Sequence, residues 1–289
     1  MQLRSIARLL ILTVLAGACA DASPDGSTDL SGDGIAHATE PNALLLRWGY
    51  EGGFTPPEYQ LTNLPSFSLY GNGMIVRPGP QIEIYPGPAL PALETVQVDE
   101  AGIQAILDAA FEADLDSAND MTDLGSVGVA DAPETVFSLR AGDVDRTVRV
   151  YALGELGGQP PGMADDEYAA RQALLELVDD LGSLESWLPD GSIEGGGEYQ
   201  PTGARVFVSR YRGQADLPQP PIEWPLETPL QDIGDDMGMG FRCVIVTGAD
   251  WTDRLLPVAR QANQLTPWTS VDSRFHVSFR PLLPDESAC

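Results

Sequence analysis

Cysteine chemistry is the clearest functional signal in this chain. Its three cysteines are Cys19, Cys243 and Cys289. A cysteine directly after a short apolar leader can accept lipid in an exported bacterial protein. Two cysteines in an oxidising compartment can join as a disulfide. The three thiols therefore raise two possibilities, lipid attachment at the first and a covalent cross-link between the other two.

The N-terminal residues have the pattern of an export signal. Arg4 and Arg8 precede an apolar run at residues 9–17. This run is about half of the roughly 20 residues that a membrane-spanning helix needs. Residues 1–18 are therefore predicted to be a signal peptide, and an uncleaved anchor is disfavoured.

The residues before Cys19 predict its modification. Leu15–Ala18 are small or aliphatic and uncharged, as in a bacterial lipobox. We expect Cys19 to be diacylated, to become the mature N-terminus and to hold the protein on the extracytoplasmic side of the bacterial cell membrane. Cleavage at the Ala-x-Ala-like site Ala16–Ala18, followed by simple secretion, is the alternative.

Assigning Cys19 to lipid leaves an even number of thiols. Cys243 and Cys289 are then predicted to form a disulfide that ties the last residue of the chain to a buried strand. The alternative is a buried free Cys243 and an exposed free Cys289.

No catalytic motif stands out. The chain lacks a Gly-x-Ser-x-Gly elbow, a His-Glu-x-x-His helix, a phosphate-binding loop and a dinucleotide fingerprint. Of its two histidines, His37 falls in a predicted tether. His276 falls on a predicted strand with Ser278 and Arg280, opposite an aromatic face. We expect His276 to be an ordinary surface histidine, and we assign no catalytic residue.

Acidic loops are the remaining candidates for chemistry. Asp232, Asp235 and Asp236 precede a Gly-Met-Gly turn, and oxygen-rich loops of this kind can bind calcium. In a chain with 43 acidic residues such clusters also arise as solvated loops, which is the favoured interpretation. They are weak metal candidates, and no cofactor is expected.

The charge balance limits the partners. The formal net charge is −27 and the chain contains no lysine. Such a surface favours solubility, and it does not suit nucleic acid or direct docking on anionic lipid. We expect membrane contact through the lipid on Cys19. Any other partner, an envelope protein or a small molecule, is left unspecified by the sequence.

The elements indicate an α+β fold. Alternating strands flank two hairpin turns, Asn72-Gly73 and 141–143. Helices are predicted from Asp99 to about Ala113, and from Asp165 or Asp166 to near Trp187. This order predicts an antiparallel sheet of hairpins covered by two helices.

The chain divides into four predicted parts. A signal peptide (1–18) and a flexible tether (19–40) precede an N-terminal α+β domain (41–191). The Gly-rich residues 192–199 read as a boundary. The C-terminal subdomain (199–289) is a smaller α/β unit closed by the disulfide.

Three local expectations complete the prediction. Strand 241–247 should be central and buried on both faces, and a helix should span 252–263. The proline-rich segment 78–91 should be irregular, with Ile82, Ile84 and Tyr85 packed beneath it.

Several motifs resemble an uncharacterised family of bacterial lipoproteins and secreted proteins. They are Gly52-Gly-Phe54, Pro65-Ser-Phe-Ser-Leu-Tyr-Gly-Asn-Gly73, Tyr85-Pro-Gly-Pro88 and Arg280-Pro-Leu-Leu-Pro-Asp-Glu286. The strand, Asn-Gly, strand, helix, hairpin, helix order is also similar to a small domain of unknown function. The resemblance implies the lipid anchor and the fold, and it carries no activity.

Taken together, these features predict a lipid-anchored, non-catalytic binding or structural component of the cell envelope. The alternative is an envelope hydrolase that uses carboxylates or a bound divalent metal ion from the acidic loops.

Overall fold

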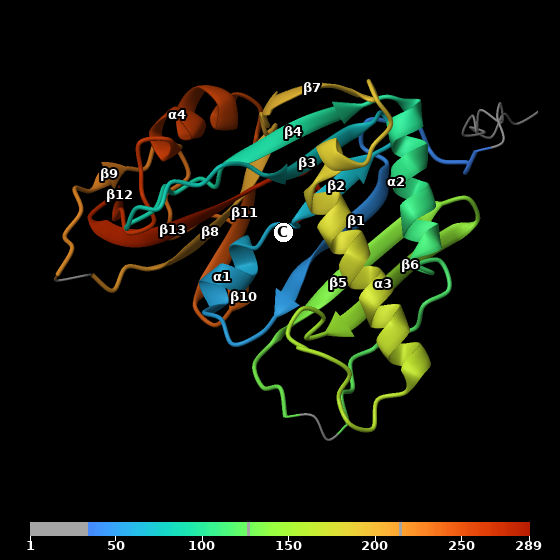
Figure 1. Cartoon of the computed structure of the whole chain (residues 1–289). Coiled ribbons are helices and arrows are strands. Elements are labelled where there is room, and N and C mark those ends of the chain that lie inside the picture. Colours follow the sequence, from blue (N-terminus) through green and yellow to red (C-terminus); the bar gives the residue numbers. More distant parts are fainter. Residues whose placement is uncertain (1–33, 126–127, 214–215) are drawn as a thin grey trace, which may run out of the picture.

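The computed structural model describes residues 34–125, 128–213 and 216–289, which build two sheets (Figure 1). The larger sheet has seven antiparallel strands in the order β6-β5-β1-β2-β3-β4-β7. They are β1 (Leu44–Gly52), β2 (Phe67–Tyr70), β3 (Met74–Pro78), β4 (Leu93–Val98), β5 (Pro133–Ala141), β6 (Val144–Tyr151) and β7 (Ile193–Glu198). Both predicted hairpins are present, β2–β3 and β5–β6.

Two helices cover one face of this sheet, as the sequence predicts. The Asp99 carboxylate accepts a hydrogen bond from the Gly102 N–H and starts α2 (Glu100–Glu112). The apolar stripe of α3 (Asp165–Gly182) packs beside it over β1 and β5. A short 3-10 turn (Leu184–Ser186) follows α3. The α+β class with an antiparallel sheet and two covering helices is therefore confirmed.

The second sheet has six strands in the order β10-β11-β8-β13-β12-β9. They are β8 (Gly203–Arg210), β9 (Ile222–Glu223), β10 (Asp235–Gly238), β11 (Phe241–Thr247), β12 (Trp268–Ser270) and β13 (Ser273–Pro281). Only the pair β9–β12 is parallel among these strands. Strand β11 lies beside the short edge strand β10 and its Val244 and Ile245 are half-buried, so the expected burial on both faces is wrong.

The C-terminal helix is shorter than predicted. A π-helical turn, η2 (Asp250–Leu255), leads into the four-residue α4 (Leu256–Ala259). Pro257 has no N–H to donate to the Asp253 carbonyl and its ring crowds that carbonyl, which explains why η2 and α4 do not form one regular α-helix. Trp251 and Leu255 are still fully buried under the sheet.

The C-terminal tail fills the space between the two sheets. Leu283 packs with Leu44, Tyr70 and Val76 on the face of the larger sheet away from α2 and α3. The C-terminus accordingly lies near the centre of the molecule in Figure 1. A short helix, α1 (Pro57–Thr62), lies against β13 on the same side. The layers are therefore helices, larger sheet, tail, smaller sheet and α4.

Two predicted boundaries need correction. The Gly-rich residues expected to separate two domains form β7, which pairs with β4, so the larger sheet extends to Glu198. The tether expected to reach Glu40 is packed from its described start. The Ile35 N–H donates to the Gln104 side chain and the Ala36 carbonyl accepts from the Gly142 N–H. Its earlier residues lie outside the described part, as do Cys19 and the signal peptide.

The segment before β4 is also different from expectation. Ile82, Ile84 and Tyr85 are 64%, 59% and 68% exposed, rather than packed beneath the prolines. The prolines of this segment have no N–H to donate to a strand ladder, and residues 79–87 form no strand or helix. No helix in the described ranges is long and apolar enough to cross a membrane.

The predicted disulfide is confirmed. Cys243 on β11 and Cys289 at the chain end are joined, with 6.1 Å between their Cα atoms and a sequence separation of 46 residues. Cross-linking a loop of this length removes chain entropy from the unfolded state worth about 4 kcal/mol. The bond also holds the tail in its place between the sheets.

Replacing both cysteines, as Cys243→Ser/Cys289→Ser, should lower the free energy of unfolding by about 4 kcal/mol in urea denaturation. Reductant should destabilise the wild-type protein by a similar amount and leave the double variant unaffected. Equal stability of the oxidised wild type and the double variant would contradict this account.

Candidate functional site

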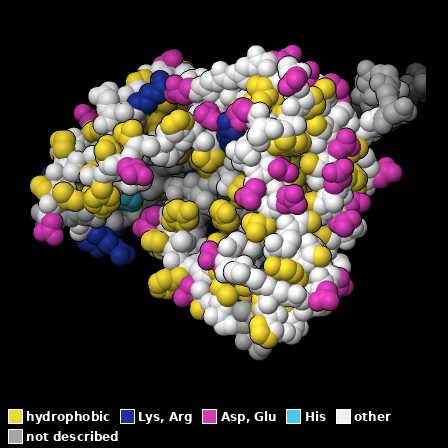
Figure 2. All heavy atoms as spheres, viewed as in Figure 1, with side chains coloured by type: hydrophobic (Ala, Val, Ile, Leu, Met, Phe, Trp, Pro, Cys, Tyr) yellow, Lys and Arg dark blue, Asp and Glu magenta, His cyan; other side chains and the backbone are white. Residues whose placement is uncertain are grey.

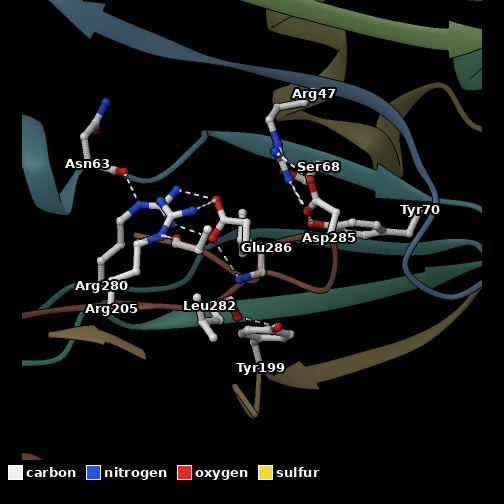
Figure 3. Close-up of polar contacts among 12 residues, drawn as sticks. Arg47, Asn63, Ser68, Tyr70, Tyr199, Arg205, Arg280, Leu282, Asp285 and Glu286 are labelled. Carbon is white, nitrogen blue, oxygen red and sulfur yellow. Dashed lines mark hydrogen bonds and ion pairs between the residues drawn. The ribbon is translucent and has the colours of Figure 1, made fainter. Parts of the chain in front are cut away.

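A polar cluster between the sheets is the largest concentration of buried charge among the residues described. Arg47 of β1 forms two hydrogen bonds to the Asp285 carboxylate, at 2.7 and 3.0 Å (Figure 3). The Tyr70 hydroxyl donates to the same carboxylate at 2.9 Å. Arg47 also donates to the Ser68 hydroxyl at 3.0 Å. The tail is thereby fastened to the larger sheet.

A second ion pair fastens the tail to the smaller sheet. Arg280 of β13 meets Glu286 through two hydrogen bonds at 2.5 and 2.8 Å, and both side chains are about nine-tenths buried. Glu286 also accepts from the Leu283 N–H, and Arg280 donates to the Asn63 carbonyl. Arg205 donates to the Ala288 carbonyl. Figure 3 shows both pairs side by side around the tail.

Each carboxylate of the cluster is paired with a guanidinium group. Burial alone would raise the pKa of the Asp285 carboxyl, but Arg47 and the Tyr70 hydroxyl outweigh it, so this pKa is lowered. Burial raises the pKa of Tyr70 far above its usual range, so its hydroxyl stays protonated as a donor. Burial likewise raises the pKa of Tyr199 to about 12, and its hydroxyl donates to the Leu282 carbonyl. The charged groups and hydroxyls of this cluster already hydrogen-bond to one another. We therefore interpret the pairs Arg47–Asp285 and Arg280–Glu286 as a structural clamp that holds the tail.

His276 lies on β13, as predicted for a strand histidine, and it is half-buried rather than fully exposed. Its Nε2 atom is 3.2 Å from the Ser278 hydroxyl oxygen. Burial lowers the pKa of the His276 imidazole, although Glu58 of α1 opposes the shift. The neutral ring therefore suits a packed position beside α1, and we assign it no catalytic role.

The acidic residues proposed as weak metal candidates are not gathered into a site. Asp235 and Asp236 lie on the exposed edge strand β10, and the Asp236 carboxylate accepts from the Gly238 N–H to close the turn. Asp232 lies in the preceding turn, where its N–H donates to the Pro229 carbonyl. Within the described ranges, no three His, Cys, Asp or Glu side chains are close enough to share a metal ion.

An apolar groove lies where the two sheets meet. Its volume is about 360 Å³, within the range of small-ligand sites. Its walls come from the segment before β4, the end of β7 and α4. The principal lining residues are Ile82, Leu90, Glu198, Tyr199, Leu256 and Ala259.

The surroundings of the groove are also apolar. Ile82, Ile84 and Tyr85 belong to the few large hydrophobic side chains that are mainly exposed. Figure 2 shows many hydrophobic side chains on the half of the molecule that carries the smaller sheet and the 78–91 segment, and acidic side chains are spread over the whole of this face. Exposed apolar groups beside a concave surface are typical of binding sites.

Comparisons with protein-family models, curated proteins and solved structures find no match to this chain. The resemblance to bacterial lipoproteins therefore stays a prediction, and the site must be interpreted from its own residues.

Sequence reasoning found the disulfide and missed the clamp and the groove. Arg47 interrupts the apolar strand Leu44–Trp48, and Arg280 ends another strand. A charge inside an apolar strand is a signal for a buried partner, but the sequence does not say that Asp285 and Glu286 supply it. The groove joins segments far apart in the chain and has no local pattern.

Asp285→Ala should lower the free energy of unfolding by about 3 kcal/mol, because Arg47 is left without its partner in the interior. Asp145→Ala breaks an exposed ion pair with Arg140 and should change the free energy of unfolding by less than about 0.5 kcal/mol.

The Asp285 carboxyl should also make stability depend on pH. Because its pKa is lower in the folded state, the stability that it contributes is present above the unfolded carboxyl pKa of about 4 and is lost as pH falls below that value. Urea titrations from pH 7 to pH 3 should therefore show a shallower acid loss for Asp285→Asn than for the wild type. Identical pH profiles for Asp285→Asn and the wild type would rule out a contribution of the Asp285 carboxylate to stability.

Proposed function

We propose that this protein is a lipid-anchored extracytoplasmic binding protein that has no catalytic role. The single observation that carries the proposal is the apolar groove lined by exposed Ile82, whose chain neighbours Ile84 and Tyr85 are also exposed. Solvent-exposed apolar groups of this kind have an energetic cost in a monomer, which binding of an apolar group relieves.

The other features support the same proposal. The Cys243–Cys289 disulfide suits an oxidising compartment outside the cytoplasm. The leader and Cys19 provide the predicted anchor. The tail carboxylates Asp285 and Glu286 are paired with arginines in the clamp, and the groove is lined mainly by aliphatic side chains and prolines. The hydrolase alternative gains no support from the described residues, so it is not developed further.

The lipid anchor can be tested by metabolic labelling in a bacterial host with an alkyne fatty acid. The wild-type protein should be labelled and remain with membranes, whereas Cys19→Ala should lose the label. Cys243→Ser/Cys289→Ser is the matched control and should keep it, because only Cys19 is expected to carry lipid. Equal labelling of the wild type and Cys19→Ala would reject the anchor.

The groove can be tested with Nile red, an uncharged apolar dye. The wild-type protein should bind it with a saturable rise in fluorescence. Ile82→Ser should raise the dissociation constant about fivefold, as expected for the loss of about 1 kcal/mol of apolar contact.

Val271→Ser is the control for this experiment, because Val271 is 71% exposed and does not line the groove. It should leave dye binding unchanged. Absence of saturable binding, or equal losses in both variants, would count against the groove as a binding site.

A further inference from the structure

The two sheets end in four edge strands, and three of these are protected against pairing. The outer edge of β6 is occupied by Met121, whose N–H donates to Arg149 and whose carbonyl accepts from Tyr151. Strand β9 has two residues and is flanked by Pro221 and Pro225. Strand β10 is short, bulged and acidic. These are the devices by which natural sheets avoid adding strands.

The fourth edge, β7, has no comparable protection. It is six residues long, and five of them are exposed. Its centre is Gly195-Gly196-Gly197, so no side chain shields the backbone there. A Cβ atom added at Gly195 or Gly197 would meet no other atom within 4 Å. In Figure 1, β7 forms the margin of the larger sheet beyond β4.

The hydrogen-bond register defines which groups are available. The Tyr199 N–H donates to the Leu93 carbonyl at 2.9 Å, and Gly197 pairs with Thr95. Because bonded pairs alternate along an antiparallel ladder, the backbone groups of Gly196 and Glu198 point away from β4. No described backbone group outside the sheet bonds to them. A side chain at Gly196 would also collide with the Thr95 carbonyl, which explains the glycine.

We infer that β7 binds an extended basic segment of a partner protein as an additional strand, with an apolar side chain of that segment in the groove. The inference rests on the proposed binding function and names its partner class. Main-chain hydrogen bonds to an open edge supply affinity in this mode, and side-chain pockets supply specificity.

The apolar groove begins where the open edge of β7 ends. Glu198 is the last residue of β7 and also lines the groove, as does Tyr199. A segment paired with β7 therefore leads directly to the apolar walls formed by Ile82, Leu90 and Leu256. One extended polypeptide can use both features at once.

Charge selects a basic segment over a second copy of this chain. Glu194 and Glu198 are exposed on β7, and the chain has a net charge of −27. An antiparallel pair of two β7 strands centred on Gly196 would place Glu194 opposite Glu198, and like charges directly opposite are destabilising. Glu198 also meets Arg260 at 3.1 Å, but this pair is exposed and weak.

The test uses the full exported protein and a fluorescein-labelled peptide, Arg-Val-Arg-Val-Arg-Val-Arg-Val, measured by fluorescence anisotropy. A second peptide has the same sequence and charge but is N-methylated at its four central residues. Loss of about two backbone hydrogen bonds should weaken its binding roughly tenfold. Amide exchange at Gly196 and Glu198 should slow when the unmodified peptide is bound.

Protein variants separate strand addition from general charge attraction. Glu194→Gln/Glu198→Gln should weaken peptide binding several-fold, and Ile82→Ser should weaken it by a similar factor. Asp235→Asn/Asp236→Asn removes the same charge from the protected edge β10 and should have no effect.

Equal binding of both peptides, or equal losses in the β7 and β10 variants, would overturn the inference in favour of nonspecific attraction. Slow exchange at Gly196 in a protein dimer without peptide would overturn it in favour of self-association. If Nile red still binds in either case, the proposed binding function survives and only the strand-addition mode is rejected.

Discussion

The tail between the two sheets is the constraint on which the rest of the structure depends. Asp285 pairs with Arg47 of the larger sheet, and the next residue, Glu286, pairs with Arg280 of the smaller one. These two consecutive carboxylates therefore neutralise two buried guanidinium groups, one from each sheet. Each pair has a desolvation cost, so its main effect is to penalise any arrangement in which the partners separate. The disulfide at the following Cys289 adds a covalent limit to the same tail.

This arrangement explains why the clamp charges are paired with one another and how the groove is formed. The charges of the clamp are saturated with hydrogen bonds to one another. By fixing the sheets against each other, the clamp brings α4, the end of β7 and the segment around Ile82 together. The groove and the open edge of β7 therefore share a rigid support, and ligand binding does not need to pay for ordering it.

Local patterns predicted the parts of the fold that depend on local chemistry. The Asn72-Gly73 turn, the Asp99 cap and the apolar stripe of α3 each have a short-range signature, and each was found. The errors concern tertiary context. Gly195–Gly197 looked like a linker because glycine has low strand propensity, yet β4 recruits it as an edge strand. Ile82 looked like a core residue by type, but no layer covers it. The Arg47–Asp285 pair of the clamp joins residues 238 positions apart in the sequence, which no local pattern reveals.

The tail holds the two sheets as one body with a preformed groove between them. Pulsed dipolar spectroscopy tests it directly, with genetically encoded spin labels at the exposed positions Thr147 of β6 and Arg274 of β13. We expect one narrow distance distribution in the oxidised protein, unchanged when Nile red is added. A broad or bimodal distribution in that protein would contradict it, because the sheets would then move independently and the groove would not be a fixed feature.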